Sequence, residues 1–269
     1  MQNDRQRCLA EFAEYYRTHC DAVVEPAESG NASFSRSAVH ALYDSYCRDS
    51  VGRLYDAVTS VGALDKLRRR PLAILDVSCF ATTQLFRIVF PDARVHACDK
   101  HLKWHPFLDG VEARLCNLER DSLPYEDGIF DLVIFTETLE HIPRSPYAIL
   151  GEIHRVLKRG GTLLFSVPNL CALRNRIKLM LGRDILSVEL FNADSFGHFR
   201  EYSMREAEYL CRAVGLEPQN REYVYYRPAL GDWGRHLASA GITEVLSRPL
   251  TWAVPSLRPV CQVVAVKHE

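Results

Sequence analysis

Short apolar runs alternate with helical patterns along the middle of the chain. Four of these runs are apolar on both faces and lie at residues 72–77, 94–99, 130–135 and 161–167. Such runs are typical of parallel strands covered by helices on both sides, because neither face of the sheet meets water. Two later runs, 221–227 and 260–267, lack a covering helix of regular length between them, and we expect an antiparallel pair at one sheet edge.

A helical segment precedes the alternation of strands and helices, and two further segments interrupt it. From residue 2 to about residue 70, aromatic and aliphatic side chains recur three and four positions apart, which predicts helices. We therefore predict a helical N-terminal cap over residues 1–70 and an α/β domain over residues 71–269. Two stretches depart from the alternation, and we interpret them as insertions at about 170–202 and 228–256.

The composition allows a large core and excludes several functional classes. Of the 269 residues 47% are hydrophobic, enough to fill a core of domain size. A net charge of −1 gives no field that would gather nucleic acid or an anionic membrane, so we expect neither as a partner. The N-terminus lacks the apolar core of a signal peptide, and we expect a cytoplasmic protein. A homodimer is left open.

The cysteines argue against a disulfide framework and against a metal site. There are nine of them, an odd number, and no C-x-x-C spacing occurs. Cys79, Cys98 and Cys116 would lie near the ends of neighbouring strands, but no histidine spacing completes a set of ligands. We interpret them as small buried hydrophobic residues and predict no bound metal ion.

Polar side chains gather just after the predicted strands, where an open parallel sheet binds its ligands. Asp99 ends the second strand, 23 residues beyond Asp76 in the first, and is placed to accept two hydrogen bonds from ribose hydroxyls. A carboxylate repels a nearby phosphate, so Asp99 favours a nucleoside over a 2′-phosphorylated cofactor. The full set after the strands is Asp76, Ser78, Cys79, Phe80, Asp99, Lys100, Asn117, Leu118, Thr136, Glu137, Glu140 and His141.

Four segments follow one another in register: ILDVSCF, VHACD, NLERDSLPYEDGIFDLVIFTETLEHI and EIHRVLKRGGTLLFSVPN, over roughly residues 72–168. They resemble the motifs of class I S-adenosylmethionine-dependent methyltransferases, particularly the branch that acts on small molecules. The resemblance implies a doubly wound, mostly parallel, seven-stranded α/β sheet of the Rossmann-like methyltransferase type. It also implies methyl transfer from S-adenosylmethionine to an oxygen or nitrogen of a small molecule, a sugar or another biosynthetic intermediate, with S-adenosylhomocysteine as product.

The resemblance also implies roles for individual residues. Asp76 would approach the methionine amino group, Asp99 would hold the ribose, and Asn117 with Leu118 would flank the adenine. Family members usually have Asp at the position of Asn117, and Asn keeps a side-chain oxygen for the adenine amino group. The implied cofactor-binding residues are Asp76, Ser78, Cys79, Phe80, Asp99, Lys100, Asn117, Leu118, Thr136 and Glu137.

The first cofactor loop departs from the family pattern. The family has approximately D-x-G-x-G-x-G, whereas this chain has Ser78, Phe80 and Thr82 at the glycine positions. A non-glycine residue in the left-handed region costs on the order of 1 kcal/mol, so two of them would weaken cofactor binding roughly tenfold to a hundredfold. Two alternatives therefore stay open: a scaffold protein that has lost the cofactor, and an enzyme that uses it for another reaction such as cyclisation.

The acceptor side offers a different set of polar residues. His141 follows the fourth strand beside Glu140, and in the resembled family this histidine is a structural partner in some members and a general base in others. We take His141 as the candidate catalytic residue. The basic segment 173–183 is interpreted as part of a lid over the acceptor. The other polar candidates for the acceptor pocket are Arg174, His198, Arg200 and Tyr202.

Overall fold

The computed structural model describes residues 2–19, 51–59, 71–80, 82–101, 108–186, 197–225 and 248–268. The chain divides into two compact units. The first comprises residues 1–115 and 227–232, and the second comprises residues 116–226 and 233–269. Among the helices in the described ranges, none is both long and apolar enough to cross a membrane.

The first unit contains three parallel strands. β1 (Ala73–Val77) and β3 (Glu112–Leu115) lie on either side of β2 (Arg94–Asp99), and both pair with it in parallel. The register sets Val77 opposite Cys98, so that β1 and β2 end at the same edge. The ends of these strands carry the acidic residues that the sequence singles out for the cofactor.

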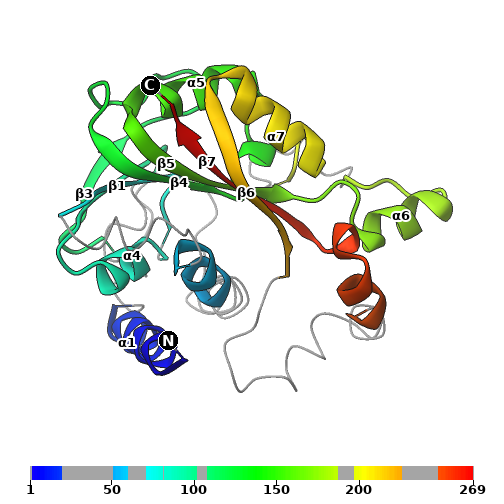
Figure 1. Ribbon diagram of the computed structural model, residues 1–269, viewed down its shortest axis with the longest axis horizontal. Coiled ribbons are helices and arrows are strands. Elements are labelled where there is room, and N and C mark those ends of the chain that lie inside the picture. Colours follow the sequence, from blue (N-terminus) through cyan, green and yellow to red (C-terminus); the bar gives the residue numbers. More distant parts are fainter. Residues whose placement is uncertain are drawn as a thin grey trace, which may run out of the picture. The chain divides into compact units, whose positions relative to one another are not determined.

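Helices in the first unit pack into one hydrophobic cluster. α4 (Thr83–Val89) connects β1 to β2, and α1 (Gln2–His19) runs beside it (Figure 1). A helical stretch at residues 51–59 also contributes to the cluster. The helical periodicity near the N-terminus is therefore confirmed where the structure describes it. The buried members of the cluster are Cys8, Phe12, Tyr16, Val51, Leu54, Tyr55 and Leu85.

The second unit contains the other four strands. β4 (Phe130–Thr136) pairs in parallel with β5 (Leu157–Pro168), which pairs antiparallel with β7 (Val260–Lys267). β6 (Leu216–Val224) pairs antiparallel with β7 and takes the edge. The predicted antiparallel pair of late strands is confirmed, and with seven strands, mostly parallel, the α/β fold class is confirmed as well.

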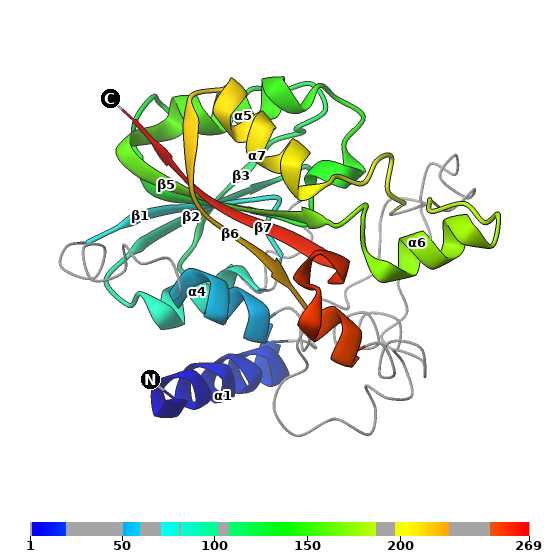
Figure 2. The same cartoon turned by 45° about the vertical axis from the view of Figure 1, so that its right-hand side comes forward.

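Two helices cover one face of the second unit's strands. α5 (Pro146–Val156) and α7 (Met204–Ala213) lie next to each other over β5, β7 and β6 (Figure 2). Ser203 and Glu206 form a capping box at the start of α7, with the Ser203 hydroxyl accepting the Glu206 N–H. The predicted basic helix is α6 (Leu173–Met180), which follows β5 and extends away from these strands.

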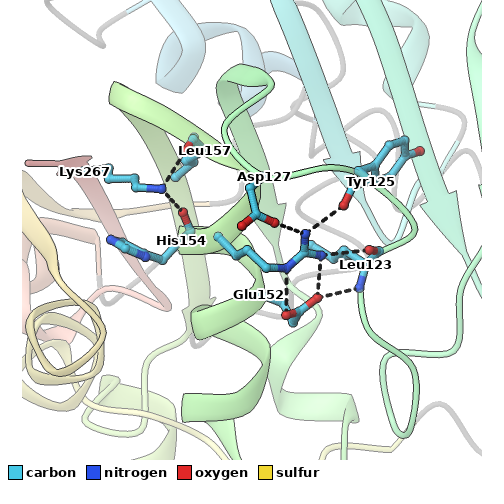
Figure 3. Close-up of polar contacts among 8 residues, drawn as sticks. Leu123, Tyr125, Asp127, Glu152, His154, Leu157 and Lys267 are labelled. Atoms are coloured by element: carbon cyan, nitrogen blue, oxygen red, sulfur yellow. Dashed lines mark hydrogen bonds and ion pairs between the residues drawn. The ribbon is translucent and has the colours of Figure 1, made fainter. Parts of the chain in front are cut away.

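Arg155 of α5 holds the loop of residues 116–129 in the second unit. Its guanidinium donates to the Leu123 and Tyr125 carbonyls at 2.9 and 2.8 Å, and to Asp127 Oδ1 at 2.7 Å (Figure 3). Glu152, one turn earlier on α5, accepts from Arg155 at 2.8 Å and from the Leu123 N–H at 2.9 Å. The hydrogen bond that Arg155 donates to Glu152 and, to a lesser extent, the one to Asp127 raise the pKa of Arg155 further above its ordinary value.

Replacing Arg155 by alanine is expected to lower the free energy of unfolding by about 2–3 kcal/mol. The change removes the donor of two carbonyls and leaves the Glu152 carboxylate with the Leu123 N–H alone. Lost hydrogen bonds to a charged group carry costs of this size. Arg155→Lys should recover part of the loss, because lysine keeps the charge but not the planar fork. Urea unfolding measures both. Arg120→Ala, an exposed arginine of the same loop, is the control, and equal stability of the Arg120 and Arg155 variants would contradict the account.

Candidate active site

Asp76 is a buried carboxylate near the end of β1. The Thr83 hydroxyl, from the first turn of α4, donates to its Oδ2 at 2.5 Å. Burial is the main reason that the pKa of Asp76 rises from an ordinary 3.8 to about 7, with Asp99 adding to the rise and Thr83 opposing it. A cationic ligand group beside Asp76 would favour the ionised carboxylate and would itself be held by it.

The first loop keeps a left-handed residue at the first glycine position of the family pattern. Ser78 has a φ of 65°, and its backbone N–H donates to the Cys98 carbonyl at 2.8 Å. At the third glycine position Thr82 has a φ of −66°, which any residue adopts. Phe80 packs against the hydrophobic cluster of α1, α4 and residues 51–59. Among the described loop residues the strain is therefore confined to Ser78.

Asp99 lies at the end of β2, on the strand next to Asp76. Its Oδ1 accepts the His101 N–H at 2.8 Å, and its Oδ2 accepts the Ser78 hydroxyl at 3.2 Å. Burial raises the pKa of Asp99 as well. Ser78 thus stands at a glycine position of the family pattern, and its hydroxyl donates a hydrogen bond to the Asp99 carboxylate.

Cys79 and Lys100, which lie close in sequence to Asp76 and Asp99, differ in their surroundings. Cys79 is buried against Ala97 and Leu108, and burial raises the pKa of its thiol. It packs as a small hydrophobic residue, as predicted for the cysteines. Lys100 is exposed at the end of β2.

Asn117 and Leu118 begin a turn in the second unit. The Asn117 Oδ1 accepts the Glu119 N–H at 3.0 Å, and the Leu118 carbonyl accepts from Arg144 at 3.0 Å. The Asn117 oxygen has a second lone pair, which is the one that an adenine amino group would use.

Thr136 and Glu137 stand at the end of β4. Glu137 has a φ of 50°, an unusual conformation for a residue other than glycine and one that is found at functional sites. The Ser166 hydroxyl of β5 donates to Glu137 Oε1 at 2.9 Å, so the carboxylate is fixed against the neighbouring strand.

Glu140, His141 and His198 form one cluster in the second unit. Glu140 and His141 belong to the short 3₁₀ turn η3 (Leu139–His141), and the Glu140 carbonyl accepts the Phe199 N–H at 2.7 Å. His141 Nδ1 lies 3.1 Å from the Gly197 carbonyl, and His141 Nε2 lies 3.8 Å from Glu140 Oε1. The His141 and His198 rings meet edge to face with centroids 4.8 Å apart.

Glu201 joins this cluster to α6. Its carboxylate is 4% exposed, and Oε1 lies 3.5 Å from His198 Nδ1 and 3.7 Å from the Arg174 guanidinium. The Asn175 amide, on the buried side of α6, donates to Glu201 Oε2 at 2.5 Å. Arg174 and His198 thus face one buried acid, and the His198 ring in turn meets His141.

Arg200 and Tyr202 are directed elsewhere. The Arg200 guanidinium donates to Glu206 at 2.5 Å and lies 4.9 Å from the centre of the Tyr202 ring. Tyr202 is buried and pairs through its backbone with Asn169. Arg200 and Tyr202 therefore lie near the capping box at the start of α7. Their predicted contact with a methyl acceptor stays a prediction. Most of the insertion predicted at about 228–256 lies outside the described residues.

The pKa of Asp76 makes the stability of the ligand-free protein depend on pH. The folded chain holds a proton at Asp76 up to about pH 7, whereas the unfolded chain releases it near 3.8. This contribution to stability is present below about pH 4 and is lost as pH rises through 7, by at most about 1.4 kcal/mol per unit. Asp76→Asn should flatten this dependence in urea unfolding series, and identical pH profiles for variant and parent would exclude the assignment.

Ser78 offers a direct test of strain in the first loop. Ser78→Gly and Ser78→Ala both remove the hydroxyl that reaches Asp99, but only glycine relieves the left-handed conformation. We expect the glycine variant to be more stable than the alanine variant by about 1 kcal/mol in thermal or urea unfolding. Equal stabilities would mean that the backbone at Ser78 carries no strain.

Comparison with known proteins identifies the central segment. Residues 75–165 match the family described as "Methyltransferase domain". A stretch of 136 residues is 32% identical to malonyl-[acyl-carrier protein] O-methyltransferase 1 of Coxiella burnetii, and covers 49% of this chain and 46% of that protein. The chain therefore spans about half the length of this curated relative.

Solved structures share the fold at lower sequence identity. A Galdieria sulphuraria protein, provisionally described as a sarcosine dimethylglycine methyltransferase, is 12% identical, with a TM-score of 0.54 over 96% of this chain and 98% of that one. The [4+2]-cyclase SpnF is 17% identical, with a TM-score of 0.52 over 81% and 83% of the two chains. Residues 75–165 of this chain are thus similar to methyltransferase domains, and the fold is shared with methyltransferase structures.

Proposed function

We propose that this protein transfers a methyl group from S-adenosylmethionine to an oxygen or nitrogen atom of a small molecule. The observation that carries the proposal is the pair of acids Asp76 and Asp99 at the ends of adjacent strands, with Ser78 left-handed between them. This is the arrangement that a nucleoside with an amino acid attached requires: one acid for the ammonium group and one for the ribose.

The residues of the first unit fit the cofactor chemically. Asp76 is buried with a raised pKa, so an ammonium group would complete its surroundings by favouring the charged form. Asp99 is held by Ser78 and His101 and would accept the two ribose hydroxyls. The bound cofactor would supply an electrophilic methyl group on a sulfonium. The chain's own contribution is to bind and orient it, because alignment supplies much of the rate in an in-line displacement.

Residues of the second unit would serve the adenine and the acceptor. Asn117 would receive the adenine amino group through its remaining lone pair, with Leu118 beside it. His141 would take the proton from a hydroxyl or amine acceptor. Because Nδ1 faces the Gly197 carbonyl and carries the proton there, Nε2 is the nitrogen with a lone pair to offer.

The acceptor is best described by its chemistry. Arg174 and His198 lie around Glu201 near His141, so a polar acceptor such as a sugar or another hydroxylated intermediate suits this part of the unit. The curated relative acts on a malonyl group on a carrier protein, and a carboxyl oxygen of that kind would need no base. Acceptors of the two kinds therefore differ in their dependence on His141.

Methyl-labelled S-adenosylmethionine distinguishes this function from its alternatives. The chain is incubated with labelled cofactor and small hydroxyl, amine and carboxyl compounds, and the products are separated by mass spectrometry. Label in a product supports the proposal. Rearranged acceptor with the label still in the cofactor indicates another reaction such as cyclisation. Bound cofactor that neither loses its label nor promotes any change indicates a scaffold.

A further inference from the structure

Glu140, His141 and His198 form a cluster of side chains of the kinds that bind metal ions. Their spacing in the sequence does not predict this cluster. Their ligand atoms lie within 4.8 Å of one another. The Glu140 carboxylate is 1% exposed, whereas the two imidazoles are about one third exposed and reachable by small ions. Two imidazoles and one carboxylate are ligands that first-row transition metals take, with positions left over for a further ligand.

The surroundings of both imidazoles orient a nitrogen toward such an ion. His141 Nδ1 faces the Gly197 carbonyl at 3.1 Å, which fixes a proton there and leaves Nε2 toward Glu140. His198 Nδ1 lies 3.5 Å from Glu201 Oε1, and the Asn175 amide holds that carboxylate from the other side. A second layer of carbonyl and carboxylate partners is what metal-binding histidines have in known sites.

We propose that Glu140, His141 and His198 bind a divalent transition-metal ion. A cation about 2.1 Å from each ligand atom brings the atoms roughly 3–4 Å apart, which needs only side-chain rotations. The Glu140–His141 pair already has this separation at 3.8 Å. The hydrogen bond from the Phe199 N–H to the Glu140 carbonyl keeps His198 beside the other two ligands.

The ion would change how the acceptor loses its proton, and this consequence rests on the proposed function. A metal ion lowers the pKa of a hydroxyl bound to it and orients that group. With the ion present, His141 Nε2 would be a ligand, the ion would lower the pKa of a bound acceptor hydroxyl, and the proton of that hydroxyl would pass to water. Without the ion, the same nitrogen takes the proton directly. Metal binding itself requires neither cofactor nor acceptor.

Cobalt is a suitable probe because its visible absorption reports the ligands. Tag-free full-length protein is freed of metal with a chelator and titrated with Co²⁺ by calorimetry and absorption spectroscopy. We expect one Co²⁺ per chain, with bands of nitrogen and oxygen ligation and no thiolate band. Burial raises the thiol pKa of Cys79, Cys211 and Cys261, which disfavours Co²⁺ binding by these three thiols.

Two histidine variants decide the assignment. His198→Ala, a change at a partly exposed ligand, should weaken Co²⁺ binding at least tenfold to a hundredfold. His154→Ala, which removes a partly buried imidazole of α5, should bind Co²⁺ like the parent. Absence of binding by the parent, or equal binding by parent and His198→Ala, overturns the proposal. S-adenosylhomocysteine binding is measured on the same samples, so that loss of the cofactor function is recognised separately.

Discussion

Replacing His141 by alanine is expected to lower the rate of methyl transfer about a hundredfold or more while S-adenosylmethionine binds as before. The side chain lies on the η3 turn of the second unit, beside Glu140 and His198, and its Nε2 faces this cluster. Removing it takes away either the base that receives the acceptor's proton or, if the proposed ion is bound, one of the ligands of that ion. The cofactor contacts proposed for Asp76 and Asp99 are unaffected.

The comparison must separate chemistry from folding. Rates under saturating cofactor and acceptor are measured together with cofactor affinity and thermal unfolding. His154→Ala is the matched control, because it deletes a partly buried imidazole of α5 that belongs to no proposed site. If His141→Ala keeps the parental rate with a hydroxyl or amine acceptor, His141 is a structural partner of Gly197 and alignment alone carries the reaction.

The second large effect concerns the ribose. Asp99→Ala is expected to cost roughly 2–4 kcal/mol of cofactor affinity, because two charge-assisted hydrogen bonds are lost. Asp99→Asn should lose less, since the amide oxygen still accepts a hydrogen bond. Calorimetric titration with S-adenosylhomocysteine measures both variants.

Asp99 also holds the first cofactor loop in place, so the experiment must separate a loss of binding from a loss of stability. Its carboxylate holds the Ser78 hydroxyl and the His101 N–H, so unfolding of each variant is followed in parallel. Asp92→Ala, an exposed acid just before β2, is the control and should bind cofactor like the parent. Parental affinity in both Asp99 variants would mean that the ribose is held elsewhere.

Strands that are buried on both faces could be predicted from the sequence. β2 and β7 coincide with the runs at 94–99 and 260–267, because their apolar residues have no other stable place than inside the sheet. β3 gave no such run. Its residues Glu112–Leu115 are mostly exposed at the sheet edge, where packing imposes little on the sequence.

The candidate site was only partly accessible to sequence reasoning. The motif singles out Asp76 and Asp99, and the missing glycines suggested two strained positions, whereas among the described loop residues only Ser78 has a left-handed backbone. At Thr82 the backbone has a negative φ, which needs no glycine, and a sequence pattern does not reveal such a conformation. Thr83 could have been identified from the sequence, because it carries a hydroxyl at the start of the helix that follows the loop.

The cluster around His141 depends on contacts between distant segments. His198 is 57 residues beyond His141, and the hydrogen bond from the N–H of the next residue, Phe199, to the Glu140 carbonyl holds it beside the cluster. Glu201 and Asn175 come from different segments again and meet in the interior. No local spacing encodes these proximities, so neither the pairing of Glu201 with Asn175 nor the proposed metal site could be predicted from the sequence.

Direct binding of S-adenosylhomocysteine to the purified parent tests the central claim, that the acids of β1 and β2 form a cofactor site. Calorimetry, with thermal unfolding alongside, should give saturable binding of one ligand per chain and a higher unfolding temperature. The left-handed conformation of Ser78 costs on the order of 1 kcal/mol, which leaves such binding measurable. No heat and no thermal shift at millimolar ligand would contradict the account.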